Sequence, residues 1–217
     1  MDLEEVWRIR EEERYPALFG AVCHGIFPLT RELFEGQFKQ SDIDPKWLHY
    51  GVFEFEPTPS RPSWLYVTSG HSNPWHEAPS EYRETNESGV GAEFTFATSQ
   101  RGDWAIRTLQ SMLAFDILLW ADRFQGKPPL SLHDKIPLRA PINGDPSCVL
   151  RNLIVTEPEG IADEFTLPSG KVLLVGFTAV SDAELTEART KGSGHMIDQL
   201  RTAGFHPIND PARKSLV

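Results

Sequence analysis

The chain has 217 residues and a mass of 24.5 kDa, which fits one domain over residues 1–217. Its composition of 40% hydrophobic, 11% aromatic and 24% charged residues is typical of a globular protein and argues against disorder or a coiled coil. Its 21 basic and 31 acidic residues give a net charge of −10, which would repel nucleic acid and anionic lipid, so we expect neither as a ligand.

The first part of the chain contains one predicted helix and two predicted strands. Residues 3–15 carry a rough apolar stripe among Glu and Arg, with Asp2 at the N-cap position. Tyr15-Pro16 should end this helix, because a proline interrupts the helical hydrogen bonds. Alternation from Trp47 to Phe55 predicts a strand, and residues 64–68 predict a second one.

A long polar segment, residues 69–89, follows the second strand. A connection of that length inside a compact domain is more often functional than idle. Strand character resumes over residues 91–98. We expect the aromatic side chains of these adjoining strands to include one alternating set that packs against the helix that follows. The side chains concerned are Trp64, Tyr66, Phe94 and Phe96.

The strongest helical pattern covers residues 103–124, with Asp103 as its expected cap. Gly126 and the Pro128-Pro129 pair mark its end. Its apolar positions recur at intervals of three and four residues, which predicts one buried stripe. These positions are Ala105, Leu109, Met112, Leu113, Ile117, Trp120 and Phe124.

The last third of the chain alternates between predicted strands and short helices. The strands are expected over residues 149–156, 164–167 and 171–179. Ser181 should cap a helix over residues 182–189, and Gly192-Ser193-Gly194 should separate it from a helix over residues 195–202. Because strands and helices do not alternate regularly, we predict an α+β fold with a mixed, largely antiparallel sheet packed with helices.

Familiar catalytic signatures are missing from the sequence. It contains no phosphate-binding loop, dinucleotide fingerprint, nucleophile elbow or His-Glu-x-x-His motif, so we expect no cofactor and no catalytic centre. Gly89-Val90-Gly91 resembles the start of a glycine-rich loop, but the next residues do not continue the motif. Two glycines before a strand are more simply a turn that permits close backbone approach.

His71, His76 and Glu77 form the most ligand-like cluster, because two imidazoles and a carboxylate could hold zinc and leave a position for water. Their spacing fits no helix face, and no cysteine lies nearby. We therefore predict no metal site and favour a structural or surface role for these residues. A small hydrolase, metal-assisted through these three side chains, stays as the alternative function.

Three other groups have both a chemical and a structural interpretation. Cys23-His24 could pair a thiolate with an imidazole, but adjacent residues seldom point the same way, so we expect a small buried thiol. Asp116 is either a buried acid with a raised pKa or a member of the polar face of its helix. Gly192-Ser193-Gly194-His195 could form an anion-binding nest, although a hinge between helices explains the glycines better.

The polar segment holds the strongest candidate for a binding surface. Trp75 on this segment is either a recognition anchor or a lid folded back over the sheet. Acidic side chains around it would steer a basic partner, or would only aid solubility. The predicted partner-binding residues are His71, Asn73, Trp75, His76, Glu77, Glu81, Glu84 and Glu87. The acidic residues 157–164 are the next candidate surface.

Two segments give the chain a resemblance to a known family. They read Ser63-Trp64-Leu65-Tyr66-Val67-Thr68-Ser69-Gly70-His71-Ser72 and Ser88-Gly89-Val90-Gly91-Ala92-Glu93-Phe94-Thr95-Phe96. Both resemble the suppressor of fused family, in which an aromatic strand ending in Ser/Gly precedes a Ser-Gly-x-Gly-x-Glu-φ-Thr-Phe segment. The downstream order also agrees, through the long helix to a closing Ile208-Asn209-Asp210-Pro211-Ala212-Arg213-Lys214-Ser215. The resemblance covers roughly residues 45–217 and leaves 1–45 as an N-terminal helical extension.

This resemblance implies the α/β domain of that family and no catalytic centre. Animal members are cytoplasmic regulators in Hedgehog signalling that hold transcription factors in a two-domain clamp, and this chain has length for the first domain only. Compact bacterial members are more similar to it and are proposed to be immunity proteins against toxins encoded beside them. The resemblance thus implies a non-catalytic protein-binding module, of immunity or regulatory type, whose partner is a protein such as a basic toxin.

The expected compartment is the cytoplasm. Residues 117–121 form the longest apolar run in a helical pattern, far short of the roughly 20 residues of a membrane span, so we expect no membrane association. The first residues are acidic where a signal peptide needs positive charge. Cys23 and Cys148 belong to no Cys-x-x-Cys motif, and so few thiols are typical of a reducing compartment.

Overall fold

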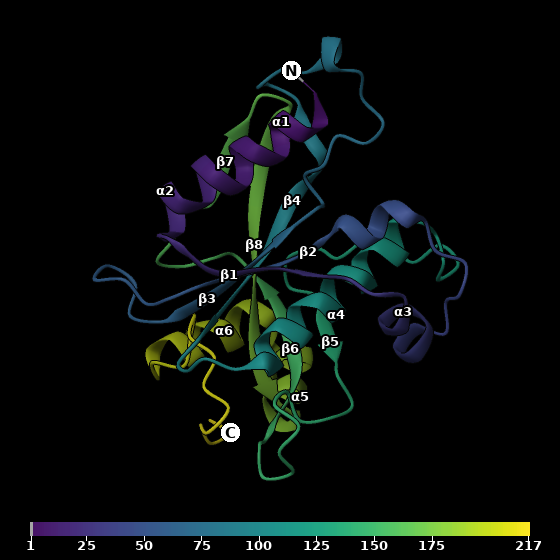
Figure 1. Ribbon diagram of the computed structural model, residues 1–217. Helices are drawn as coiled ribbons and strands as arrows, with labels where there is room; N and C mark the ends of the chain where they lie inside the picture. Colours follow the sequence, from purple (N-terminus) through teal and green to yellow (C-terminus); the bar gives the residue numbers. More distant parts are fainter. Residues whose placement is uncertain (1) are drawn as a thin grey trace.

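The computed structural model describes residues 2–217. Their centre is an eight-stranded sheet with the order β1-β2-β3-β4-β8-β6-β5, in which β7 pairs only with β8 (Figure 1). β4 and β8 run parallel and the other pairs are antiparallel, which confirms the predicted mixed, largely antiparallel α+β fold. The strands are β1 Val22–Pro28, β2 Gly51–Phe55, β3 Trp64–Ser69, β4 Glu87–Thr98, β5 Lys135–Pro137, β6 Leu150–Thr156, β7 Glu164–Leu167 and β8 Gly170–Ser181.

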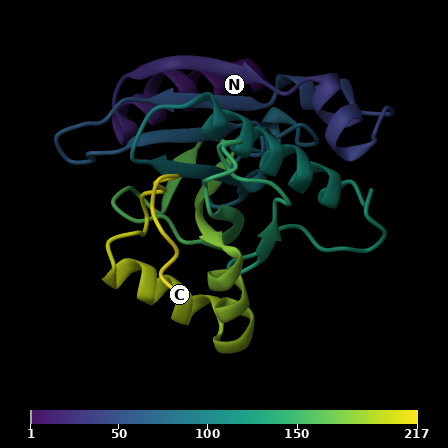
Figure 2. The same ribbon diagram turned by 90° about the horizontal axis from the view of Figure 1, so that it is seen from below.

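The helices cover both faces of this sheet. They are α1 Leu3–Arg8, η1 Ile9–Arg14, α2 Tyr15–Phe19, α3 Arg31–Phe38, η2 Pro45–His49, η3 Pro79–Glu81, α4 Asp103–Trp120, α5 Asp182–Lys191 and α6 Ser193–Thr202. α4 packs on one face with Tyr66, Phe96 and Phe177. The N-terminal helices pack on the other face with Phe53 and Leu65, and α5 and α6 cover the same face further along β8 and β6 (Figures 1 and 2).

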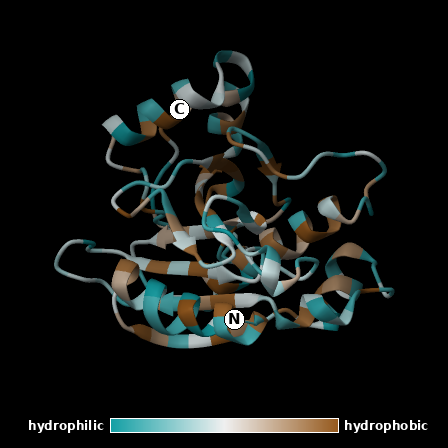
Figure 3. Ribbon diagram, turned by 90° about the horizontal axis from the view of Figure 1, so that it is seen from above, coloured by the Kyte–Doolittle hydropathy of each residue, from teal (hydrophilic) through white to brown (hydrophobic). Residues whose placement is uncertain are grey.

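Hydropathy follows these layers. Figure 3 shows hydrophobic residues gathered along the strands and the inner sides of helices, with hydrophilic residues on the outer loops. Alternation produces this pattern, since successive strand side chains point to opposite faces. In β8, for example, Val172 and Leu174 join the core under the N-terminal helices, whereas Phe177 and Ala179 join the core under α4. Among residues 2–217, no helix is long and apolar enough to serve as a membrane span.

The N-terminal region differs from the prediction in two ways. Its helix begins at Leu3 with Asp2 as N-cap, as expected, but continues past Pro16 to Phe19 through the π-helical stretch η1. Proline is tolerated there because it occupies the first turn of α2, and because Tyr15 and Phe19 pack against Phe55 in an aromatic cluster. Residues 1–45 are also more than a helical extension, because β1 forms the edge of the sheet beside β2.

The strand predicted from Trp47 to Phe55 is correct only in its second half. Pro45–His49 forms the 3₁₀ helix η2, capped by the Asp44 carboxylate, which accepts a hydrogen bond of 2.9 Å from the Lys46 amide. An Asp-Pro pair favours a helical turn over an extended strand, and this local signal outweighs the alternation. β2 then begins at Gly51, where an added Cβ would lie 2.5 Å from the carbonyl oxygen of Phe27.

The helix α4 and the aromatic strands beside it confirm the predicted core. Tyr66 pairs with Phe96 across β3 and β4, and both side chains pack with Phe94 against α4, while Trp64 is only partly buried at the margin. The helix ends at Trp120, four residues before the predicted end, and Gly102 rather than Asp103 is its N-cap. Asp116 is buried, and burial raises the pKa of its carboxyl.

The C-terminal third follows the prediction closely. β6, β7 and β8 lie where expected, and Ser181 caps α5 in a capping box with Glu184. α6 begins at Ser193, two residues earlier than predicted, and Gly192 joins the two helices with φ at 100°, which supports the hinge interpretation. The short β5 was not predicted, because three residues carry too little periodicity to be recognised.

Two side chains fix the C-terminal tail onto the sheet. The Asn209 amide group donates to the carbonyls of Ala97 and Phe177 at 2.9 and 3.1 Å, and so connects β4 with β8. Arg213 donates to both carboxylate oxygens of Glu184 at 2.7 Å, with Arg213 and Glu184 both buried. The closing segment that resembles the family therefore holds the two parallel strands together.

The Glu184 ion pair should make stability depend on pH. Burial alone would raise the pKa of this carboxyl, but Arg213 and the amides of Ser181 and Leu216 bind the carboxylate and lower its pKa below the ordinary value. Because the native pKa lies below the unfolded-state pKa of about 4.3, the ionised carboxylate stabilises the fold at pH values above the unfolded-state pKa. This contribution is lost as the pH falls through the native pKa. We expect Glu184→Gln to be less stable than wild type at neutral pH, with the gap closing in acid.

Urea unfolding at about pH 7 and about pH 3 would measure this gap. Glu187→Gln on the same helix is the matched control, since Glu187 makes an exposed pair with Lys191. Such exposed pairs contribute little to stability. An unchanged gap between Glu184→Gln and wild type across the two pH values would contradict the expected linkage.

Candidate functional site

The polar segment of residues 69–89 forms one wall of an open groove of about 590 Å³. The C-terminal end of α4 and the segment of residues 44–50 also contribute to its lining. Six of the eight predicted partner-binding residues line it, namely His71, Asn73, Trp75, His76, Glu77 and Glu87. Glu81 and Glu84 are exposed but lie outside the lining. The remaining lining residues are Asp44, Trp47, Tyr50, Gly89, Val90, Ile117, Trp120 and Ala121.

A buried carboxylate organises the turn that forms this wall. Glu93 of β4 accepts hydrogen bonds from the amides of Gly70 and Ser72 at 2.9 and 3.0 Å. It also accepts from the hydroxyls of Ser72 and Thr68 at 2.6 and 2.5 Å. The two segments that resemble the family thus meet at one side chain. This role was not predicted, because burial of a glutamate depends on the tertiary fold.

The N-terminal helices supply the countercharge. Arg10 is buried, and one of its terminal nitrogens lies 3.9 Å from the Glu93 carboxylate. The same nitrogen donates to Ser72 at 3.0 Å and to the Asn73 side chain at 2.6 Å. Residues outside the family resemblance therefore help to set the shape of the groove.

Gly89 permits a close backbone contact, as the sequence indicated. Its φ of 59° lies in the left-handed region, and an added Cβ would sit 2.5 Å from the carbonyl oxygens of His71 and Asn73. The amide of the next residue, Val90, donates to the His71 carbonyl at 2.7 Å. The start of β4 is thereby fastened to the turn after β3.

Trp75 combines the two roles considered for it. Its indole lies parallel to Tyr50 and donates to the Tyr50 hydroxyl at 3.0 Å, while Trp7 of α1 meets it edge-on with centroids 5.7 Å apart. The Lys46 ammonium lies 5.5 Å from the ring centroid. The side chain is half-buried, so it packs against the fold and still presents part of its surface to the groove.

His71 points inward instead of lying on the surface. Its Nε2 is 3.7 Å from the Asp116 carboxylate, and neither ring nitrogen has a hydrogen-bond partner among the described residues. His76, by contrast, is exposed, and Glu77 is half-buried. The structure does not gather these three side chains into a ligand group: in the described part of the chain, only Cys23, His24 and Glu54 come together in that way. The constellation behind the hydrolase alternative is therefore absent from residues 2–217.

The rim of the groove is acidic, and an exposed indole faces it. Asp44, Glu77 and Glu87 contribute carboxyl groups to the lining. Burial raises the pKa of Glu77, although the Gly89 amide partly offsets this. Trp120, predicted as part of the buried stripe of α4, is 54% exposed. Periodicity alone did not reveal this, because it identifies a helix face and not where the covering layer ends.

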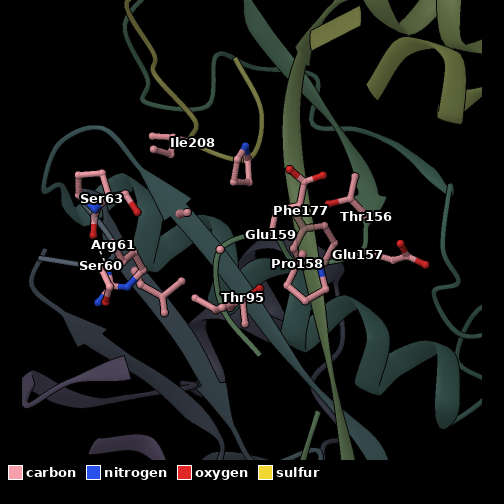
Figure 4. Close-up of a pocket in the computed structure, with 17 residues that line it drawn as sticks. Ser60, Arg61, Ser63, Thr95, Thr156, Glu157, Pro158, Glu159, Phe177 and Ile208 are labelled. Carbon is pink, nitrogen blue, oxygen red and sulfur yellow. Dashed lines mark hydrogen bonds between the residues drawn. The ribbon is translucent and has the colours of Figure 1, made fainter. Parts of the chain in front are cut away.

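A smaller cavity of about 240 Å³ opens on the other face of the sheet (Figure 4). It includes Glu157 and Glu159 of the acidic segment that was the second candidate surface. The Glu159 carboxylate is already paired with Arg201 and lies 3.2 Å from His206. The Arg61 guanidinium is held by the carbonyl oxygens of Phe19 and Glu56 at 2.9 Å. The charged groups of Glu159 and Arg61 already bind other residues of the chain, so the larger groove is the stronger candidate for a binding site.

The expectation of a buried thiol at Cys23 is wrong. Cys23 is half-buried on β1, and its Sγ lies 3.0 Å from the Nδ1 of the adjacent His24. The two neighbours point the same way because irregularities flank His24 in the pairing of β1 with β2. Cys148 is buried, and both cysteines are free.

A comparison with protein families and a comparison with solved structures each give matches. The family model described as suppressor of fused protein (SUFU) matches residues 46–214. The search of curated proteins gives no match. Among solved structures, the chain resembles Drosophila Suppressor of Fused with a TM-score of 0.60 and 18% identity, covering 85% of this chain and 49% of that one. It therefore spans about half the length of the Drosophila chain.

Two further structures are similar over nearly their whole length. A chain of the Sufu-Fu complex has a TM-score of 0.59 and 19% identity, covering 88% of this chain and 92% of that one. A SUFU homologue from Neisseria gonorrhoeae FA 1090 has a TM-score of 0.58 and 18% identity, with 99% and 94% covered. At these identities the similarity establishes the fold.

Proposed function

Because the chain belongs to the suppressor of fused family, we propose that it is a non-catalytic module that binds one protein partner and inhibits or sequesters it. One similar structure is a complex of Sufu with Fu, which supports protein binding as the mode of action. The groove supports protein binding from this chain's own residues, because its lining combines indoles with carboxylates.

The observation that carries this proposal is the placement of two of the three indoles that line the groove, those of Trp75 and Trp120. Trp120 is 54% exposed at the end of α4, and Trp75 is held in place by Tyr50 and Trp7. Tryptophan is enriched among the residues that dominate binding energy, and it acts best beside pockets that exclude water. A pre-positioned indole also loses little conformational entropy when a partner binds.

The charge of the chain suggests a basic partner. The net charge is −10, Glu87 lines the groove, and Glu84 is exposed on the same polar segment. A field of this sign speeds encounter with a cationic surface. The proposed partner is accordingly a basic toxin encoded beside this protein in a bacterium, neutralised in the cytoplasm as by an immunity protein.

Co-expression with each neighbouring gene product would test the role. A stable complex together with restored growth of cells that make the partner is the expected result. If every neighbouring product gives neither complex nor protection, the immunity role is wrong, whereas a complex without protection would support sequestration of a harmless partner.

Within such a complex, Trp120→Ala should weaken binding by about 2 kcal/mol, or about 30-fold, mainly through faster dissociation. The loss should be similar at all salt concentrations because the contact is apolar. Leu173→Ala on β8 is the matched control, since Leu173 is 52% exposed and lies outside the groove lining. Trp75 is a poorer probe because its removal would also disturb Tyr50 and Trp7. Equal dissociation rates for both variants and wild type would place the interface elsewhere.

Reversing two exposed charges should act on association instead. Glu84→Lys with Glu87→Lys is expected to slow association at low salt, with the difference fading as salt shortens the screening length to about 8 Å. Glu187→Lys on α5 is the control, because α5 covers the other face of the sheet. Stopped-flow or surface-plasmon measurements at two ionic strengths would separate the variants. If Glu187→Lys slows association as much as the double variant does, the net charge of the protein determines the association rate, and the position of the charges does not.

A further inference from the structure

A second cluster of reactive side chains lies at the sheet edge, on strands β1 and β2. The Cys23 Sγ is 3.0 Å from the His24 Nδ1, which is 3.2 Å from a carboxylate oxygen of Glu54. One potential ligand atom from each of these three side chains lies within 4.8 Å of the others. Neither Cys23 nor His24 belongs to the part of the chain that matches the family.

Backbone irregularity builds this cluster. In a regular strand, Cys23 and His24 would project to opposite faces. The pairing register between β1 and β2 shifts on both sides of His24, which lies opposite Glu54. Gly25 follows with φ at 150°, and an added Cβ there would lie 2.5 Å from the Phe53 ring. A glycine is therefore required at the residue that completes the irregular turn of the strand.

The donor set suits one class of ion. Thiolate sulfur, imidazole nitrogen and carboxylate oxygen are the ligands of zinc, with Zn–S of about 2.3 Å and Zn–N of about 2.0–2.1 Å. In a tetrahedral site these lengths place sulfur and nitrogen about 3.5 Å apart. The observed separation of 3.0 Å needs only a small opening of the two side chains. Calcium and magnesium prefer oxygen ligands and fit this set poorly.

We propose that Cys23, His24 and Glu54 bind zinc(II), with the fourth position open to solvent. The His24 side chain is 53% exposed, so an ion can reach the cluster from outside. Glu56 lies beside the site, with its carboxylate 3.3 Å from the sulfur. Three protein ligands with one open position are the arrangement that zinc adopts where it keeps a water or accepts a further ligand.

Surrounding charges act in opposite directions on this site. Glu54, Glu56 and an ionised Cys23 would concentrate negative charge, which attracts a divalent cation. A thiol must lose its proton to bind zinc, so zinc binding should release a proton and should weaken in acid. Arg101 competes, because its guanidinium donates to Glu54 at 2.9 Å and lies 3.3 Å from the His24 Nδ1. Removing Arg101 should therefore strengthen zinc binding.

Metal titration of the full chain tests the proposal directly. Zinc(II) should bind with one ion per chain in competition with a chromogenic chelator. Cobalt(II) in place of zinc should give the near-ultraviolet absorption of a thiolate-to-cobalt charge transfer, which reports the sulfur ligand itself. Binding of less than one zinc per chain, or a cobalt complex without that absorption, would overturn the proposal.

Two cysteine variants make the assignment specific. Cys23→Ser should lose the charge-transfer absorption and at least about tenfold in zinc affinity, while Cys148→Ser, the buried cysteine, should behave as wild type. Arg101→Gln should bind zinc more tightly than wild type. If the metal-free variants unfold at the same temperature as metal-free wild type, a change in zinc affinity is not caused by loss of the fold. Equal zinc affinity for Cys23→Ser and wild type, or equal losses for both cysteine variants, would refute the site.

Discussion

Replacing Glu93 with alanine is expected to lower the free energy of unfolding by about 3–5 kcal/mol, which is typical when one partner of a buried ion pair is removed. The carboxylate is buried and accepts four hydrogen bonds, two of them from backbone amides. Its loss would leave those donors without an acceptor and Arg10 with only the partly exposed Glu11, 2.8 Å away, as a countercharge. Urea denaturation at neutral pH would measure the change.

Glu87→Ala is the matched control, because Glu87 lies on the same strand but is exposed. Its effect should stay within about 0.5 kcal/mol. If Arg10 and Glu93 act as one unit, the double variant Arg10→Met/Glu93→Ala should lose less than the sum of the two single losses. Additive losses would show that the turn after β3 is held by the hydrogen bonds alone. A Glu93→Ala protein as stable as Glu87→Ala would disprove the anchoring role.

The sequence predicted those elements whose signals are local. Ser181 with Glu184 forms a capping box that is visible in the sequence, and the repeat of apolar residues in α4 extends over several turns. The strand β1 and the short β5 have no such signal, because each is stabilised by pairing with a strand that lies far away in the sequence. Edge strands in particular need little apolar alternation, since part of each faces solvent.

The sequence predicted the location of the candidate site but not the buried residues that hold it in place. The length and polarity of the segment between two predicted strands indicated that residues 69–89 are functional. Six of the eight predicted partner-binding residues line the groove. The roles of Arg10 and Glu93 were not predicted, because a buried charge is recognisable only when its countercharge is brought close by the fold. Trp120 was assigned to the core for a similar reason, since a helical period does not show which turn lacks a covering layer.

The same reasoning explains the error at Cys23-His24. Strand geometry predicts that neighbouring side chains diverge, and this rule fails only where a bulge adds a residue to one strand. The glycine at position 25 was the available signal, because isolated glycines within a strand often mark such irregularities. Bulges and their glycines are thus worth inspecting wherever adjacent residues carry metal-binding side chains.

Phe96→Ala is expected to cost about 3–5 kcal/mol, as for other large aromatic side chains truncated in a core. Phe96 is 1% exposed, pairs with Tyr66 across the sheet and meets Trp104 of α4 edge-on, with ring centroids 5.8 Å apart. Its removal would leave a cavity where β3, β4 and α4 meet, and this cavity adds to the lost transfer free energy. The denaturant midpoint should fall while the m-value stays constant, because the surface exposed on unfolding hardly changes.

Phe115→Ala on α4 is the companion variant, since Phe115 is only half-buried beside Phe38 and Phe124. It should cost clearly less than Phe96→Ala, because fewer contacts are lost and solvent can fill the space. A Phe96→Ala protein that is as stable as Phe115→Ala would mean that this sheet face is not closed by α4. The groove would then lack its rigid wall, since Trp120 is placed by the same helix.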